Sequence, residues 1–240
     1  MRNMQLHGFN NLTKNLNISV YKIDYLPLDS VALHDKYQTY IQNVFQAAML
    51  SEILDNVTEV IGAQVLSRSK QDYQPHGASS THMIADCNES TSLVNHLNKS
   101  HICAHTYPDT HQQNETAIFR LDLDISTCGV ISPLKALNYL LEHLQWDVVT
   151  MDYKVRGFTR DVAGNKHYQD EQMINITDYL LIGLKDTVDI VNDNQAHLYN
   201  YHSCLMKKSL SKSYVSTVPP QENLEVLQNE KRDLFTAYRK

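Results

Sequence analysis

Short apolar runs and alternating hydrophobic positions divide much of the chain into segments that predict strands. These segments cover residues 17–26, 58–68, 81–86, 118–125 and 147–156. The clearest is IFRLDLDI at 118–125, in which apolar and charged residues alternate. Alternation of this kind is typical of a strand with one buried and one exposed face.

Three other segments show the three-to-four-residue spacing that predicts helices. At 35–54, tyrosine and aliphatic residues recur on one face, and at 222–238 leucine and aromatic residues do so after a double proline. The strongest helix start is Ser132, a plausible capping residue, followed by Pro133 at the first helical position. The leucines that follow Pro133 form an apolar stripe along this helix.

The order of these elements predicts an α+β fold. Two β-α-β-β-type halves would form a largely antiparallel sheet with helices on one face. Residues 71–80 are expected to form a polar turn and 88–99 a loop or a frayed helix. We expect a core domain at 1–170 and a mostly helical C-terminal extension at 171–240.

Composition and charge narrow the function classes. The 240 residues are 42% hydrophobic and 20% charged, as in ordinary globular proteins with a sizeable core. The net charge of −6 offers no basic footprint for nucleic acid. The opening MRNMQLHGFNNLTK lacks the apolar run of a signal peptide, and no stretch has the apolar length of a membrane span. We therefore expect a cytoplasmic protein that binds neither nucleic acid nor membrane.

The four cysteines are scattered without CxxC spacing. This argues against a disulfide framework or a zinc ribbon and favours free thiols in a reducing compartment. One of them, Cys128, lies in STCGVISP ahead of the helix start, where a small thiol can serve packing or catalysis. Asp122 and Asp124 alternate with apolar residues, and a solvated sheet face is the favoured interpretation for both.

One further strand segment, KSHICAHTYPD at 99–109, carries more reactive groups than a strand needs. A Ser-His hydrolase is disfavoured, because no GxSxG is present and Ser100 and His105 would point to opposite faces of an ideal strand. His101 and His105 cannot bind one metal ion, since four strand residues span roughly 13 Å. The residues alone leave packing and catalysis both open at Ser100, His105 and Cys128.

Five segments match one known family in the same order. They are LHGFNNLTK, QDYQPHGAS, KSHICAHTYPD, FRLDLDISTCGVISPLKALNYL and DYKVRGFTRDVAGNKHY. In these segments the chain closely resembles S-adenosylmethionine decarboxylase proenzymes of the longer-chain bacterial subgroup. The resemblance is dense from residue 5 to 170 and weaker towards the C-terminus. Such a run of matches is far more specific than any single motif.

The resemblance implies a chain that cuts itself between Lys99 and Ser100. The Ser100 hydroxyl would attack the Lys99 carbonyl and convert the amide to an ester, which loss of the Ser100 α-proton would then eliminate. Residue 100 would become a pyruvoyl group at a new N-terminus. His105 matches the family residue that removes the α-proton, and Ser79 matches the one that assists the acyl shift. The products would be chains 1–99 and 100–240.

The same resemblance implies the chemistry of the mature enzyme. The pyruvoyl group forms a Schiff base with the substrate amine and acts as an electron sink. Cys128 matches the proton donor that completes decarboxylation, a role that a thiol can fill near neutral pH. Tyr73 matches an aromatic residue that stacks on adenine. Asp109 resembles the carboxylate that holds the ribose hydroxyls, which is commonly glutamate in relatives.

The expected substrate is therefore the small molecule S-adenosylmethionine, and its decarboxylated product is an aminopropyl donor for spermidine biosynthesis. The resemblance also implies a homo-oligomer of cleaved two-chain protomers and a possible magnesium requirement. No acidic cluster in the sequence stands out as a magnesium site.

Departures from the family pattern leave two alternatives. Asp109 has a shorter arm than glutamate, the segment after THMIAD at 81–86 is shorter than in close relatives, and His82 stands where an apolar residue is common. Because some family members decarboxylate arginine or ornithine, a pyruvoyl-dependent decarboxylase of either amino acid is the first alternative. The second is an unprocessed, non-catalytic paralogue, which nothing in the key residues supports.

Overall fold

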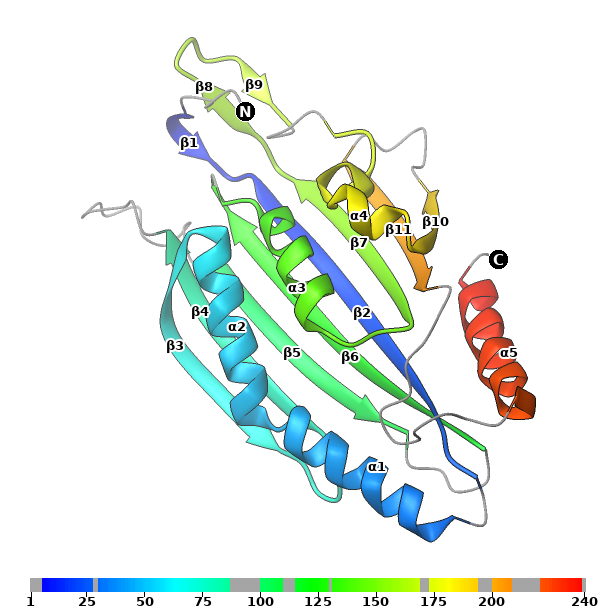
Figure 1. Ribbon diagram of the computed structural model, residues 1–240. Coiled ribbons are helices and arrows are strands. Elements are labelled where there is room, and N and C mark those ends of the chain that lie inside the picture. Colours follow the sequence, from blue (N-terminus) through cyan, green and yellow to red (C-terminus); the bar gives the residue numbers. More distant parts are fainter. Residues whose placement is uncertain are drawn as a thin grey trace.

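The computed structural model describes residues 6–27, 30–86, 100–109, 115–129, 131–168, 173–193, 200–208 and 221–238. They form an eight-stranded sheet in the order β10-β11-β7-β2-β6-β5-β4-β3 and a three-stranded sheet, β1-β8-β9 (Figure 1). The recorded strand pairs are all antiparallel. The strands are β1 Leu6–Asn10, β2 Thr13–Tyr25, β3 Ala63–Asp72, β4 Ala78–Asp86, β5 Ser100–Pro108, β6 Thr116–Cys128, β7 Val148–Arg156, β8 Thr159–Asp161, β9 Lys166–His167, β10 Val188–Asp193 and β11 Tyr201–Lys208.

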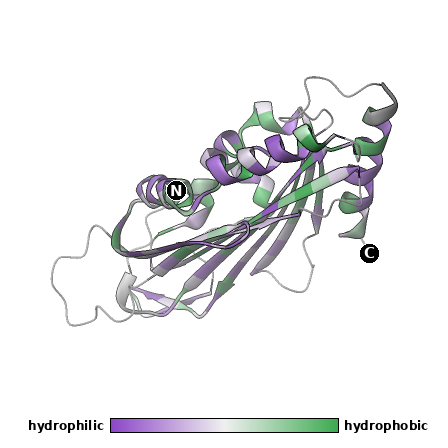
Figure 2. Cartoon of the chain, turned by 90° about the horizontal axis from the view of Figure 1, so that it is seen from below, coloured by the Kyte–Doolittle hydropathy of each residue, from purple (hydrophilic) through white to green (hydrophobic). Residues whose placement is uncertain are grey.

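Helices α1 to α4 lie over one face of the large sheet (Figures 1 and 2). The α-helices are α1 Val31–Val44, α2 Ala47–Ile61, α3 Leu137–His143, α4 Ile182–Lys185 and α5 Gln221–Ala237, and the 3-10 helices are η1 Pro133–Ala136 and η2 Ile176–Tyr179. The expected α+β class with a largely antiparallel sheet is confirmed.

The main core lies between the sheet and α1 to α3. In the central β2-β6 pair, Leu16 lies opposite Ile125 and Ile18 opposite Leu123, and all four are buried. Helix α2 adds side chains such as Leu50 to the same core. The alternation seen in the sequence therefore directs one face of each central strand towards the helices.

Helix α5 packs on the opposite face of the sheet, unlike α1 to α4. Its Phe235 joins a cluster with Tyr21 of β2, Val148 of β7 and Leu205 of β11. Strand alternation places these residues on the face away from the main core, since their neighbours along each strand belong to that core. The expectation of helices on one face is therefore met by α1 to α4, while α5 covers part of the other face.

Two predicted boundaries differ from the structure. The strand expected at 58–68 begins only at Ala63, because α2 continues to Ile61 and ends at Gly62, whose positive φ of 81° forms a left-handed cap. Val57 and Ile61 belong to the buried face of α2, so their apolar character serves a helix. The helix expected at 35–54 is divided between α1 and α2.

The C-terminal region contains strands as well as helices. Residues 171–240 were expected to be mostly helical, and α5 agrees with the helix predicted at 222–238. However, β10 and β11 extend the large sheet, and β11 pairs with β7 from Tyr201 to Lys207. The segment 88–99, expected as a loop or frayed helix, lies outside the described residues.

Candidate active site

Ser100 is the first residue of β5 and lies between two neighbouring strands. It pairs with Ile84 of β4, while the next residue, His101, pairs with Ser126 of β6. Ser100 is 4% exposed, and the following even-numbered residue of β5, Ile102, belongs to the main core. The serine hydroxyl is therefore directed into the helix-covered layer, away from bulk water.

Cys128 ends β6 beside Ser100. Its backbone N–H donates a hydrogen bond to Ser100 Oγ over 3.0 Å. Cys128 is half-buried, and strand alternation places its side chain on the face opposite the buried Thr127. The two predicted residues therefore meet through the Cys128 backbone at one end of β5 and β6, which we call the reaction end.

His105, Ser79 and Tyr73 gather near the other end of β5. Ser79 lies directly opposite His105 in the β4-β5 pair. The Tyr73 hydroxyl and Ser79 Oγ are 2.7 Å apart and share a hydrogen bond. We call these three residues the recognition end.

The two ends do not meet within one chain. Ser100 and His105 are five positions apart along β5, which corresponds to roughly 16 Å at about 3.3 Å per residue. His105 also lies on the face away from the main core, in line with the sequence-based expectation of opposite faces. Lys99 lies outside the described residues.

Asp109 follows β5 at its recognition end. Its backbone N–H donates to the Ile118 carbonyl over 3.0 Å. The pKa of the buried Tyr37 in α1 is raised, first by burial and then by the charges of Asp24 and Asp109. The Asp109 carboxylate is therefore electrostatically coupled to the inner side of α1.

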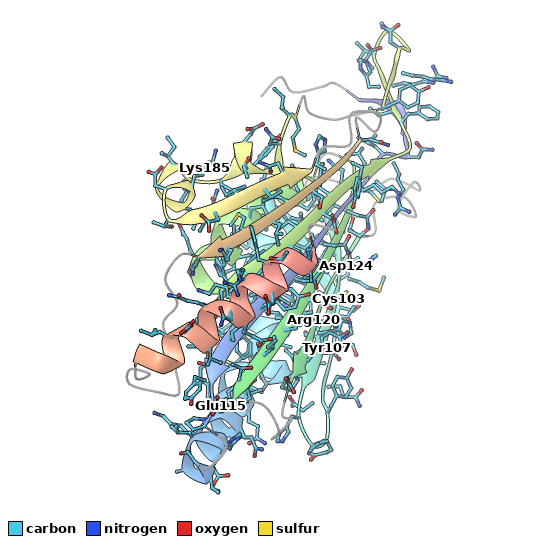
Figure 3. All side chains as sticks on the ribbon, turned by 90° about the vertical axis from the view of Figure 1, so that its right-hand side faces the viewer. Cys103, Tyr107, Glu115, Arg120, Asp124 and Lys185 are labelled. Atoms are coloured by element: carbon cyan, nitrogen blue, oxygen red, sulfur yellow. The ribbon has the colours of Figure 1, made fainter. Side chains whose placement is uncertain are left out.

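Cys103 and several charged residues line the open face between the two ends. Figure 3 shows Cys103 and Tyr107 on β5 and Arg120 and Asp124 on β6 projecting from the same side of the sheet. The Arg120 guanidinium lies 4.1 Å from the centre of the Tyr107 ring. Burial, and next the charge of Asp124, raises the pKa of the Cys103 thiol. Cys103 is therefore held as a thiol between charged neighbours.

Comparison with known proteins establishes the family. The family model described as S-adenosylmethionine decarboxylase matches residues 32–157. The S-adenosylmethionine decarboxylase proenzyme of Shigella dysenteriae serotype 1 is 39% identical over 252 aligned positions, covering 99% of this chain and 93% of that protein. The chain belongs to the S-adenosylmethionine decarboxylase family.

Further relatives carry the same decarboxylase name. The proenzyme of Citrobacter koseri is 39% identical over 245 positions, with 96% of this chain and 92% of that protein covered. The crystal structure of adenosylmethionine decarboxylase from Aquifex aeolicus VF5 aligns with 68% of this chain and 98% of its own, at 17% identity and a TM-score of 0.34. No finding favours the arginine, ornithine or non-catalytic alternatives.

The sequence interpretation missed several buried cations in this member of the decarboxylase family, among them Lys14. Lys14 of β2 has no exposed surface. It pairs with Thr127, the residue before Cys128. A signal was present, because the alternation that directs Leu16 and Ile18 into the core also directs position 14 there.

A second missed feature is a Ser-His-Asp arrangement between α2 and β4, in which the serine and the histidine are buried and Asp55 is partly exposed. Ser51 Oγ lies 3.1 Å from His82 Nε2, and His82 Nδ1 lies 3.5 Å from Asp55 Oδ1. Burial lowers the pKa of His82, which has no exposed surface. Because Ser51 is only 7% exposed, we interpret the arrangement as a polar link between α2 and β4 and not as a hydrolase triad.

Two further features concern metal binding and membrane insertion by the described residues. They contain no group of three or more His, Cys, Asp or Glu side chains that could hold a metal ion. None of the described helices is long and apolar enough to cross a membrane.

Proposed function

We propose that the chain is a self-processing, pyruvoyl-dependent S-adenosylmethionine decarboxylase that supplies an aminopropyl donor for spermidine biosynthesis. The observation that carries this proposal is the position of Ser100. It begins β5, is 4% exposed, and its Oγ accepts a hydrogen bond from the Cys128 N–H over 3.0 Å. Family membership and the proenzymes among the relatives supply the reaction class.

Self-cleavage begins at the bond between Lys99 and Ser100. Ser100 Oγ attacks the Lys99 carbonyl carbon, the C–N bond breaks, and the nitrogen of Ser100 takes up the proton. The Cys128 N–H orients the attacking oxygen and favours negative charge on it as its proton leaves. Burial of Ser100 excludes water that would otherwise hydrolyse the ester.

The ester is then opened by removal of the Ser100 α-proton, a role that we assign to His105. The Lys99 carboxylate leaves, and the resulting dehydroalanine takes up water and releases ammonia to become the pyruvoyl group. Ser79, directly opposite His105, is assigned assistance in the preceding acyl shift. Both assignments follow the family resemblance at these positions. The hydrogen bond between Tyr73 and Ser79 fixes the orientation of the Ser79 hydroxyl.

The mature site combines a prosthetic carbonyl with residues of this chain. The pyruvoyl group supplies a carbonyl that captures the substrate amine and withdraws electrons as carbon dioxide leaves. Cys128, beside residue 100, donates the proton that the product carbon needs. The Tyr73 ring, 40% exposed, offers a face to adenine, and Asp109 binds the ribose hydroxyls. No step is assigned to magnesium.

A homo-oligomer resolves the distance between the two ends of β5. In a symmetric pair, the recognition end of one chain can lie against the reaction end of its partner, because a two-fold axis repeats each contact in both directions. Among the described residues, the helix that packs on the face carrying His105 is α5, which contacts β2, β7 and β11. We therefore place each complete site between two copies of the cleaved chain.

The cysteines support a cytoplasmic location for this enzyme. Cys103, Cys128 and Cys204 are free thiols in the described part of the chain. Free thiols persist in the reducing cytoplasm, where S-adenosylmethionine would be the small-molecule substrate.

Intact mass spectrometry and a decarboxylation assay test the proposed function together. We expect two chains of residues 1–99 and 100–240, a blocked N-terminus on the second, and release of carbon dioxide from carboxyl-labelled S-adenosylmethionine. Arginine and ornithine serve as control substrates and should give no carbon dioxide. A fully processed protein that leaves S-adenosylmethionine unchanged would contradict the proposal.

Co-expression of two differently tagged inactive variants tests the shared site. In a mixed dimer of Ser100→Ala and His105→Ala chains, one of the two sites contains both intact residues. The His105→Ala chain should therefore be cleaved in the mixed dimer and remain uncut when expressed alone. If both ends of β5 act within one chain, mixing will restore no cleavage.

A further inference from the structure

Ser132 is a buried serine whose hydroxyl is not used by the described contacts of the fold. The sequence pattern marks it as a capping residue, and it does precede η1, with Pro133 directly after it. Its side chain, however, makes no capping hydrogen bond. Ser132 is 4% exposed, and its Oγ has no hydrogen-bond partner among the described residues. A buried hydroxyl without a partner costs free energy, so its place in the fold does not explain this residue.

One hydrogen bond holds Ser132 next to the reaction end. The buried Thr127 donates from Oγ1 to the carbonyl of Ile131, the residue before Ser132, over 2.9 Å. Thr127 itself precedes Cys128, whose backbone N–H contacts Ser100 Oγ. Ser132 is therefore attached, through Ile131 and Thr127, to the end of β6 that carries the assigned proton donor.

Ser132 and Ser100 lie in the same helix-covered layer. The β5-β6 register, continued by one residue, places Ser100 opposite Thr127, with Cα atoms about 5 Å apart. Two positions after Ser100, Ile102 belongs to the main core, and two positions after Ser132, Leu134 belongs to it as well. Ser100 and Ser132 are each 4% exposed. The Ser132 hydroxyl and residue 100 thus share a layer that is closed to bulk water.

The proposed self-cleavage would deprive a second donor in this layer of its acceptor. In the uncut chain the Cys128 N–H donates to Ser100 Oγ over 3.0 Å. That oxygen leaves as part of the Lys99 carboxylate when the ester is opened, so residue 100 no longer carries it. The Cys128 N–H then loses this acceptor and can bind another one. The mature layer therefore offers two hydrogen-bond donors, the Cys128 N–H and the Ser132 hydroxyl.

We propose that Ser132 Oγ and the Cys128 N–H bind the α-carboxylate of S-adenosylmethionine. The inference rests on the function proposed above. The amine and the carboxylate of this substrate are attached to one carbon atom, so capture of the amine by the carbonyl of residue 100 brings the carboxylate into the same layer. A carboxylate needs hydrogen-bond donors where water is excluded. The two donors beside residue 100 meet this need.

Two donors also orient the carboxylate. Hydrogen bonds to an ionised acceptor are shorter and stronger than those between neutral groups, so they define the direction of the group that they hold. The carbon–carbon bond to the carboxylate breaks most readily when it is aligned with the electron-withdrawing group formed at residue 100. Ser132 is therefore a substrate-binding residue that favours substrates with a free carboxylate.

The reaction product separates a contact with the carboxylate from all other contacts. Decarboxylated S-adenosylmethionine keeps the amine, the ribose and the adenine of the substrate and lacks only the carboxylate. Ser132→Ala should raise the KM for the substrate by about 10-fold or more, because a hydrogen bond to a charged group is lost. The inhibition constant of the product should stay unchanged. Ser132→Thr keeps a hydroxyl and should retain most of the affinity for the substrate.

Ser80 provides a matched control in the same layer. It is 1% exposed, and its Oγ also lacks a hydrogen-bond partner in the described part of the chain. It pairs with Ala104 of β5, which is four positions, or about 13 Å, from Ser100. Ser80→Ala should therefore change neither the KM for the substrate nor the inhibition constant of the product.

The experiment uses purified, processed protein, with processing checked by intact mass spectrometry and folding by a thermal melt. Steady-state release of carbon dioxide gives the KM, and inhibition by the product gives its inhibition constant. A higher KM in Ser132→Ala with an unchanged inhibition constant supports the proposal. An unchanged KM overturns it, and so does an equal rise in both constants.

Ser132→Gly is the second variant without the hydroxyl. If neither Ser132→Ala nor Ser132→Gly gives folded, processed protein, Ser132 serves the fold or the cut, and the proposal is overturned. A processed wild-type protein without activity on S-adenosylmethionine would instead contradict the proposed function.

Discussion

The residues assigned to the two ends of β5 differ in burial because they lie on opposite faces of the sheet. At the reaction end, Ser100 is buried and its hydroxyl is held by a backbone N–H. At the recognition end, Tyr73 is 40% exposed and hydrogen-bonds to Ser79 next to the half-buried His105. A closed environment suits a reaction of the chain with itself, and an open one suits contact with a substrate or a second copy. The difference indicates that the attacking hydroxyl is shielded from water, while the other residues assigned to processing and recognition stay accessible.

The largest effect is expected from removal of the attacking hydroxyl. Ser100→Ala leaves no oxygen to attack the Lys99 carbonyl, so denaturing gels should show one full-length band and the assay no carbon dioxide release. Ser126→Ala, which alters another serine of the same sheet opposite His101, is the control and should be cleaved normally. Two bands from Ser100→Ala would mean that the cut lies elsewhere.

The next largest effect is expected at Cys128, the half-buried cysteine of the reaction end. Cys103, which is also half-buried but lies on the open face, provides the comparison. Cys128→Ala should still be cleaved, because only its backbone N–H contacts Ser100, but kcat should fall by about 100- to 10,000-fold without the proton donor. Cys103→Ala is the matched control and should keep most of the activity. Equal kcat values for the two variants would remove Cys128 from its assigned role.

Burial of His82 predicts that the free energy of unfolding depends on pH. Burial lowers its pKa in the folded protein, so the unfolded chain binds the proton more readily below its ordinary pKa of about 6.5. The stability that the neutral His82 side chain contributes to the fold is therefore fully present above pH 6.5. It is lost as the pH falls below this value, at up to about 1.4 kcal/mol of unfolding free energy per pH unit. Urea titrations between pH 7 and 5 measure this slope.

His82→Leu is the comparison for that slope, because it removes the proton-binding group from its contacts with Ser51 and Asp55. The variant should lose less stability than the wild type between pH 7 and 5. An identical slope in the two proteins would assign the pH dependence to other groups.

The smallest effect is expected at Asp109. Asp109→Glu lengthens the carboxylate arm by one methylene and restores the residue that relatives commonly carry, so the KM for S-adenosylmethionine should fall by a few-fold, equivalent to about 1 kcal/mol. The kcat value should stay the same, since the ribose hydroxyls assigned to Asp109 take no part in the bond changes. Steady-state kinetics with Asp109→Asn as the control separate the two parameters, and a lower kcat with unchanged KM would contradict the ribose assignment.

The central strands could be predicted from the sequence because one face of each is buried. In β6, Leu121 and Leu123 alternate with Asp122 and Asp124, and this pattern needs no knowledge of the partner strands. By contrast, β11 is apolar at three consecutive positions, because Cys204 and Met206 face the main core while Leu205 lies under α5. Its alternation disappears when both faces are covered, so the strand was missed.

Candidate site residues could be named from the sequence, but their arrangement in space could not. The spacing of Ser100 and His105 was enough to place them on opposite faces. The proximity of Cys128 to Ser100, however, depends on which residues of β5 and β6 lie opposite each other. These two strands are separate segments of the chain, so the pattern within either one does not fix their register. The link from Ser51 to His82 likewise depends on how α2 packs on β4. Long-range contacts of this kind are not encoded in a local pattern.

The order of strands in the large sheet decides whether the two products of a cut after residue 99 can separate. β2 would belong to the first product, yet it lies between β7 and β6 of the second, paired with β6 along 13 residues. β5 of the second product is in turn paired with β4 of the first. The two products are thus interleaved, and neither can dissociate without breaking complete ladders on both sides. The nick would end covalent continuity while the pair still unfolds as one cooperative body.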